Sequence, residues 1–194
     1  DVKQFEENFS KYIGVKYSIG TSNGTDAIEL CVRALCEKTS HHTLYIVPAN
    51  TFIATVLGIK SGNPHGKIIT VDCDQYYQVD TKDIEQTLIN SRQLYKNCVI
   101  VGVHLYGHCC DVIEILRLCK EYDCVFMEDS SQSHGAITQL GKTGSVGILS
   151  AFSLYPGKNL GACGDAGIIT TNNDDLNEIL IKLRNFGARD KYNY

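Results

Sequence analysis

A lysine surrounded by small residues is the first candidate for covalent chemistry in this sequence. Lys158 lies in the segment FSLYPGKNLGACGDAG, residues 152–167, between two apolar runs and without an acidic residue beside it. A lysine in such a pocket can have a lowered pKa and act as an amine nucleophile that forms a Schiff base with a carbonyl. The alternative is an exposed loop lysine, the commoner situation for this residue type.

A second candidate follows an apolar run that is typical of a strand. Glu128 and Asp129 open the segment EDSSQSHGA, which also contains Gln132. In open α/β sheets, ligands bind beyond the carboxyl ends of the strands, so carboxylates placed there can contact a cofactor. The alternative is a capping box at a helix start, since Asp129 and Gln132 are three residues apart.

A third candidate is the polar segment TSNGTD, residues 21–26, between a predicted strand and a predicted helix. The N-terminus of a helix presents backbone N–H groups without partners, and the helix dipole there favours a phosphate. The same residue types are the usual helix N-caps, so a simple capped helix start is the alternative. The spacing G-x-x-x-x-G-K of a P-loop is absent.

Four neighbouring residues offer ligand types that zinc accepts, namely His104, His108, Cys109 and Cys110. No second cluster with a familiar ligand spacing completes a tetrahedral set, and we predict no metal site. The nine cysteines are an odd number, form no C-x-x-C pair and fall partly inside apolar runs. Cysteine in such runs behaves as a small buried hydrophobe, so we expect reduced thiols.

Short apolar runs alternate with segments of helical period along the chain. We predict strands at Tyr17–Gly20, Leu44–Val47, Lys67–Val71, Val99–His104, Cys124–Met127, Leu149–Phe152 and Gly167–Thr171. Helices are predicted at Val2–Tyr12, from Ala27, at Ile53–Lys60, at Asp83–Ile89, from Asp111 as N-cap, and at Leu176–Leu183. Strands that are apolar throughout are typical of a sheet covered on both faces. The sequence therefore predicts an α/β fold with a mostly parallel central sheet and helices on both faces.

Composition excludes several classes of protein. The 194 residues are 43% hydrophobic and 21% charged, which is ordinary globular usage and argues against disorder. The net charge of −4 comes without a basic cluster, so we predict no nucleic-acid partner. The apolar runs are too short to span a membrane, and the start lacks a signal-peptide pattern. We expect a cytoplasmic protein.

Six segments in a fixed order resemble the DegT/DnrJ/EryC1/StrS family of sugar aminotransferases, pyridoxal-phosphate (PLP) enzymes of the aspartate-aminotransferase fold type I. They are SNGTDAI, PANTFIAT, VHLYGH, EDSSQSHGA, FSLYPGKNLGACGDAG and LRNFG. The resemblance runs from Phe5 to Tyr194. Family members are considerably longer, so it implies that residues 1–194 are the PLP-binding large domain, truncated at both ends, with the C-terminal small domain missing.

The resemblance implies two catalytic residues. Lys158 would hold PLP as a Schiff base and then carry the proton between substrate carbon and cofactor. Asp129 would face the pyridine nitrogen and keep it protonated, so that the ring can accept the electron pair left by the departing proton.

The resemblance also implies further contacts with PLP. Gln132 would hydrogen-bond the phenolic oxygen of the ring, and Phe52 would stack on the ring face. The phosphate would be held by the backbone N–H groups of Thr25 and Asp26 and by the hydroxyl of Ser153, in agreement with the helix N-terminus argument.

The activity implied by the resemblance is transfer of an amino group from glutamate to a keto group of a nucleotide-linked deoxy sugar, in a homodimer whose sites lie at the interface. The segments YPGKNLGA and LRNFGARDKY resemble members that aminate C3 of a 3-keto-6-deoxyhexose. A C4 aminotransferase and a non-catalytic PLP-binding or regulatory relative are the alternatives. A dinucleotide-binding domain ranks last, since the G-x-G-x-x-G fingerprint is missing.

Overall fold

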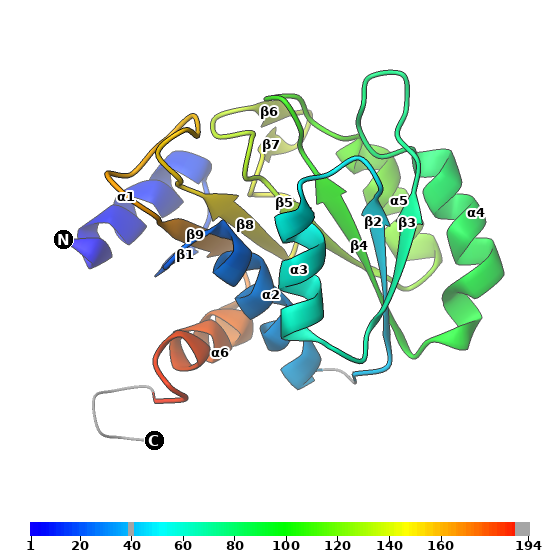
Figure 1. The fold of residues 1–194 in the computed structure, drawn as a ribbon, viewed down its shortest axis with the longest axis horizontal. Coiled ribbons are helices and arrows are strands. Elements are labelled where there is room, and N and C mark those ends of the chain that lie inside the picture. Colours follow the sequence, from blue (N-terminus) through cyan, green and yellow to red (C-terminus); the bar gives the residue numbers. More distant parts are fainter. Residues whose placement is uncertain (39–40, 189–194) are drawn as a thin grey trace.

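The computed structural model describes residues 1–38 and 41–188 and contains a seven-stranded sheet (Figure 1). Its strands are β1 (Tyr17–Thr21), β2 (Thr43–Pro48), β3 (Lys67–Val71), β4 (Asn97–Val103), β5 (Val125–Asp129), β8 (Leu149–Ser153) and β9 (Gly167–Thr171). All seven predicted strands are confirmed, with ends that shift by up to two residues. A separate two-stranded sheet, β6 (Ile137–Thr138) with β7 (Gly141–Lys142), was not predicted.

The strand order in the main sheet is β1-β9-β8-β5-β4-β2-β3. The five strands β3, β2, β4, β5 and β8 are parallel, whereas β9 is antiparallel to both of its neighbours. The predicted α/β fold with a mostly parallel sheet is confirmed. Parallel strands end at the same edge of a sheet, so residues far apart in the chain meet there.

Helices cover both faces of this sheet (Figure 1). They are α1 (Val2–Ile13), α2 (Gly24–Lys38), α3 (Ile53–Gly62), α4 (Thr81–Ser91), α5 (Val112–Glu121) and α6 (Asp174–Arg184), with a short 3₁₀ turn η1 (Arg92–Leu94) after α4. Buried residues of α2, α3 and α6, such as Ile28, Ile59 and Leu180, form one core with the sheet. α4 and α5 cover the other face, and α1 packs there through Phe9 on Phe152.

Side-chain caps set two helix starts. The predicted cap of α5 is confirmed, since Asp111 Oδ1 accepts a 3.1 Å hydrogen bond from the N–H of Glu114. α2 begins at Gly24 rather than near Ala27, because Asn23 accepts from the N–H of Asp26 with its side chain and from that of Ala27 with its carbonyl. An early start brings this helix N-terminus to the edge of the sheet.

The capping-box alternative for EDSSQSHGA is wrong. Asp129 is the last residue of β5, and a series of turns follows it rather than a helix. Its carboxylate accepts from the N–H of Ser131 at 3.1 Å, and Gln132 makes its hydrogen bond elsewhere. The carboxylate of Asp129 is thus placed at a strand end instead of a helix start.

Across the described residues, no helix is both long and apolar enough to span a membrane. The part of LRNFGARDKY from residue 189 onward lies outside the described residues.

Candidate active site

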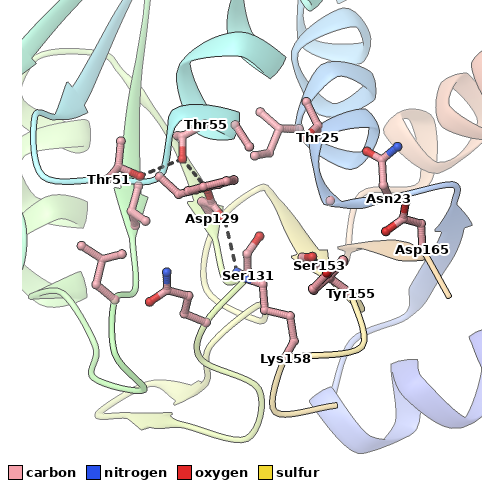
Figure 2. A pocket seen from close by; sticks show the side chains of 17 residues that line it. Asn23, Thr25, Thr51, Thr55, Asp129, Ser131, Ser153, Tyr155, Lys158 and Asp165 are labelled. Carbon is pink, nitrogen blue, oxygen red and sulfur yellow. Dashed lines mark hydrogen bonds between the residues drawn. The ribbon is translucent and has the colours of Figure 1, made fainter. Parts of the chain in front are cut away.

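A cavity of about 460 Å³ lies at the carboxyl ends of β4, β5 and β8 (Figure 2). The last residues of these three strands, Val103, Asp129 and Ser153, all line it. The first turns of α2 and α3 supply a second wall, and the loop between β8 and β9 supplies a third. The cavity is therefore built from segments that are well separated in the sequence.

Most of the predicted site residues line this one cavity. They are Lys158, Asp129, Gln132, Thr25, Ser153 and Phe52. The exception is Asp26, whose N–H donates to Asn23 Oδ1 at 2.8 Å and whose carboxylate accepts from the hydroxyl of Ser22. The structure thus brings six of the seven predicted residues together and places Asp26 outside the cavity lining.

The carboxylate of Asp129 is held in place by two hydrogen bonds. Its Oδ2 accepts from Thr55 Oγ1 at 2.7 Å, and Thr51 Oγ1 lies 2.8 Å from that hydroxyl (Figure 2). Its Oδ1 accepts from the N–H of Ser131. Both Asp129 and Thr55 are buried, at 4% and 1% exposure. A buried carboxylate with these partners has a fixed orientation and faces the cavity as an acceptor.

The N-terminus of α2 approaches the end of β8 very closely. A Cβ atom on Gly24 would lie 2.6 Å from Ser153 Cβ, so only glycine allows this approach. Asn23 caps the amides of Asp26 and Ala27, whereas the N–H groups of Gly24 and Thr25 have no protein acceptor among residues 1–38 and 41–188. These two amides and the Ser153 hydroxyl provide the donors that an anion requires.

Lys158 lies in the loop that connects β8 to β9. The backbone N–H of Lys158 donates to the carbonyl of Tyr155 at 2.8 Å. The backbone N–H of Ala162 donates to the carbonyl of Leu154 at 2.8 Å, which joins the two ends of this segment. Lys158 is half-buried and lines the same cavity as Asp129 (Figure 2). The alternative of an ordinary exposed loop lysine is not what the structure shows.

Two further lining residues have distinct environments. Gln132 Oε1 accepts a 3.0 Å hydrogen bond from the N–H of Tyr106, which fixes the amide. Phe52 occupies the N-cap position of α3 and lines the cavity. The residue is 64% exposed. A large exposed aromatic ring at a cavity wall is free to stack on a planar ligand.

Glu128 lies beside Asp129 in β5 but takes no part in the cavity. Successive strand residues point to opposite faces of the sheet, and Glu128 accepts backbone hydrogen bonds from Gly144, Val146 and Gly147. Burial raises the pKa of Glu128 to about 7, against the lowering effect of these N–H groups. His104 Nε2 lies 4.0 Å from its carboxylate, and burial lowers the pKa of His104 to about 4.

The four residues weighed as metal ligands do not assemble. His104 Nδ1 accepts from the N–H of Cys110, whereas His108 is exposed and bonds Cys109 beside it. Within residues 1–38 and 41–188, no three His, Cys, Asp or Glu side chains are arranged to hold a metal ion.

Several residues of the cavity were not predicted from the sequence. Among them are Thr55, with a hydroxyl group, and Asp165, with a carboxylate. Both lie inside segments used for the family resemblance, PANTFIAT and FSLYPGKNLGACGDAG. A signal for Thr55 existed in the TxxxT spacing at the start of α3, which places the hydroxyls of Thr51 and Thr55 on one side.

Comparison with known proteins gives consistent matches over the whole chain. The sequence model of the DegT/DnrJ/EryC1/StrS aminotransferase family matches residues 1–194. The chain is 41% identical over 99% of its length to a dTDP-3-amino-3,6-dideoxy-alpha-D-galactopyranose transaminase of Aneurinibacillus thermoaerophilus, of which it covers 51%. It spans about half the length of the curated relatives it matches.

Two solved structures are similar to this one. S. venezuelae DesV, in complex with a ketimine intermediate, has a TM-score of 0.87 and 32% identity, over 98% of this chain and 49% of that one. Bacillus subtilis NtdA, with bound cofactor PMP, has a TM-score of 0.78 and 34% identity, over 93% of this chain and 39% of that one.

Proposed function

The chain belongs to the DegT/DnrJ/EryC1/StrS aminotransferase family of PLP-dependent sugar aminotransferases, and we propose that its cavity binds PLP and supports transfer of an amino group to a nucleotide-linked sugar. The observation that carries this proposal is that Lys158 and Asp129 line one cavity at the carboxyl edge of the sheet. An amine and a buried carboxylate that share a cavity are the two groups the chemistry requires.

The groups around the cavity fit PLP in chemical type. The ring has an aldehyde, a pyridine nitrogen and a flat face, for which Lys158, Asp129 and Phe52 offer an amine, a carboxylate and an aromatic ring. The phosphate matches the free N–H groups at the start of α2, together with Ser153. In this assignment the amides of Gly24 and Thr25 hold the phosphate, whereas the N–H of Asp26 already donates to Asn23 Oδ1 and does not contribute as the sequence had predicted.

When bound, PLP supplies an electron sink for the carbanion formed at the substrate carbon. Asp129 would hold a proton on the pyridine nitrogen, and Thr55 would keep the carboxylate aimed at that atom. Lys158 Nζ would bind the aldehyde carbon in the resting state and later carry a proton to and from the substrate carbon. Gln132, fixed by Tyr106, would donate its amide N–H to the phenolic oxygen.

For the substrates, we propose glutamate as amino donor and C3 of a 3-keto-6-deoxyhexose, linked to a nucleotide, as acceptor. Support comes from the 41% identical relative, which is described as a dTDP-3-amino-3,6-dideoxy sugar transaminase. Amination at C4 is the competing proposal, since a GDP-perosamine synthase is also 32% identical to the chain. Mass detection of aminated products from matched 3-keto and 4-keto nucleotide sugars distinguishes them, and the C3 assignment fails if only 4-keto sugars react.

A homodimer is part of this proposal, with sites at the interface between subunits. Exposed apolar residues support it: Phe52 and Tyr155 line the cavity, and Ile53 and Leu57 follow Phe52 in α3. These four residues expose between 51% and 64% of their surfaces. Apolar groups gathered at a cavity rim are typical of surfaces that another chain covers. Light scattering at micromolar concentration tests this, with a dimer mass expected and a monomer mass contradicting it.

Cofactor binding is tested by titrating the protein with PLP and following the absorbance of the Schiff base. We expect a visible band in the wild type and its loss on addition of glutamate. A band that glutamate leaves unchanged would instead support a PLP-binding relative without turnover. The absence of any band in a folded protein would contradict the proposal.

A further inference from the structure

Three cysteines gather at the end of the sheet that lies opposite the cavity. Cys98 is the second residue of β4, Cys124 directly precedes β5, and Cys119 lies in the last turn of α5. Val99 and Val125 are partners in parallel register, which places Cys98 and Cys124 side by side at the amino ends of the two strands. Each thiol is also a cause of the pKa shift of the other.

The spacing of the two strands suits a covalent link. Neighbouring strands lie about 4.8 Å apart, and disulfide-linked residues have Cα atoms about 4.4–6.8 Å apart. The register therefore places Cys98 and Cys124 within the range of Cα separations that a disulfide spans. All nine cysteines of the chain lie among the described residues and are free thiols in this structure.

A guanidinium group is fixed beside Cys124. Arg92, only 16% exposed, donates to the carbonyl oxygens of Tyr122 at 2.8 Å, Tyr95 at 2.7 Å and Asp123 at 2.8 Å. The thiol of Cys124 donates a hydrogen bond to the same Tyr122 oxygen at 3.4 Å. The positive charge is thus held next to the sulfur by the backbone that flanks it.

The pKa values of the two thiols shift in opposite directions. The adjacent Cys98 thiol lowers the pKa of Cys124, the charge of Arg92 lowers it further, and partial burial opposes both. The pKa of Cys98 is raised by the adjacent Cys124 and by burial. Cys124 is half-buried, so small oxidants can reach it, whereas Cys98 is 1% exposed. Such an activated, accessible thiol beside a second cysteine is the arrangement found in redox-sensitive sites.

We propose that Cys124 and Cys98 form a peroxide-sensitive pair, in which Cys124 attacks the oxidant and Cys98 resolves the product as a disulfide. The Cys124 thiolate attacks one oxygen of hydrogen peroxide, the O–O bond breaks, and hydroxide leaves while sulfur becomes a sulfenic acid. The sulfur of Cys98 then displaces the hydroxyl group as water and forms the S–S bond. In sum, two thiols are oxidised and one peroxide is reduced to two waters.

The site lies at the amino ends of β4 and β5, away from the cavity at their carboxyl ends. The proposal is therefore independent of the proposed aminotransferase function. PLP binding is expected to be the same in reduced Cys98 and Cys124 variants as in the wild type, which gives an internal check that these variants are folded.

The test is peptide mapping of the reduced full chain after brief exposure to hydrogen peroxide and alkylation of the remaining thiols. We expect the first disulfide to join Cys98 and Cys124, with their peptides lighter by two hydrogens. In Cys98→Ser, a sulfenic acid should persist at Cys124 and be trapped by dimedone. In Cys124→Ser, Cys98 should remain reduced.

A matched control is Cys163→Ser, which removes an exposed cysteine in the lysine loop and should leave the disulfide unchanged. The proposal is overturned if Cys98 and Cys124 remain reduced while Cys163 or Cys109 is oxidised. A disulfide from Cys124 to Cys119 would also overturn it, since Cys119 is the other cysteine next to that sulfur. Even if a variant fails to fold, the peptide map of the wild type shows which two cysteines form the first disulfide.

Discussion

Thr55 Oγ1 donates a 2.7 Å hydrogen bond to Asp129 Oδ2, and this contact joins the first turn of α3 to the carboxyl end of β5 across 74 positions of sequence. Both residues are buried, so the carboxylate has this hydroxyl in place of water. A carboxylate fixed in this way can meet a ligand without first reorganising, which is how preorganised electrostatic sites gain their effect.

The first prediction concerns a substitution that removes this hydroxyl. Thr55→Val should reduce the free energy of unfolding by about 1.5–3 kcal/mol, because it leaves a buried carboxylate oxygen without its donor. Thr55→Ser retains the hydroxyl donor, so its free energy of unfolding should fall by clearly less. Urea unfolding of the three proteins measures both values. Equal losses in the two variants would show that the methyl group, rather than the hydrogen bond, is what matters.

The second prediction concerns the close approach of α2 to β8. Gly24→Ala places a Cβ 2.6 Å from Ser153 Cβ, so the helix start must move, at a cost of about 1–3 kcal/mol of stability. The affinity for PLP should fall as well, since the donors at residues 24, 25 and 153 move apart. Gly164→Ala is the control, because nothing lies within 4 Å of its added Cβ. Calorimetric titration with PLP measures the affinity, and unchanged binding in Gly24→Ala would count against the phosphate assignment.

The third prediction concerns the carboxylate. Asp129→Asn should lower kcat for amino transfer by about 10²–10³-fold, since the group that stabilises developing charge on the ring is lost. The same change should leave the covalent link to Lys158 detectable by absorbance. Asp175→Asn, which removes an exposed carboxylate on α6, should leave kcat unchanged. An Asp129→Asn enzyme with wild-type kcat would exclude the role given to Asp129.

The fourth prediction follows from the buried pair Glu128 and His104. Burial raises the pKa of Glu128 from 4.5 to about 7 in the folded protein, so this residue makes stability fall as pH rises from 4.5 to 7. Burial lowers the pKa of His104 from 6.5 to about 4, so His104 makes stability rise between pH 4 and 6.5. The two contributions oppose each other over most of this range.

Substitution separates these contributions. Relative to the wild type, Glu128→Gln should gain stability as pH rises from 4.5 to 7, by roughly 3 kcal/mol in total. His104→Gln should show the opposite trend between pH 4 and 6.5. Cys109 and Cys110 near Glu128 have pKa values raised by burial and do not titrate in this window. Urea unfolding at several pH values measures this, and a pH-independent difference from the wild type would contradict it.

The sheet could be predicted from sequence because its strands are apolar on both faces. β2 is buried at every position, and such runs stand out against the polar segments between them. The two-residue strands β6 and β7 carry no comparable pattern, since their pairing depends on turns such as the one in which Thr138 accepts from Leu140. Local hydrophobicity thus determines the main elements but leaves short pairings undetermined.

The site was predicted in outline because each motif ends a strand or starts a helix. Motif reasoning could not show that Thr55 reaches Asp129, because that contact depends on the packing of α3 against α2. Gly58 makes this packing possible, since a Cβ there would lie 2.7 Å from Ile28 Cγ2. The hydrogen bond that Asn23 Oδ1 accepts from the N–H of Asp26 could not be predicted either, because it depends on the side-chain rotamer of Asn23.

The most direct test of the central claim is to incubate the protein with PLP, reduce it with borohydride and map the modified peptide. We expect a single pyridoxyl group on Lys158 and its loss in Lys158→Ala, with Lys142→Ala as a control that remains labelled. Modification of a different lysine, or none in the folded wild-type protein, would show that Lys158 is not the residue that binds PLP.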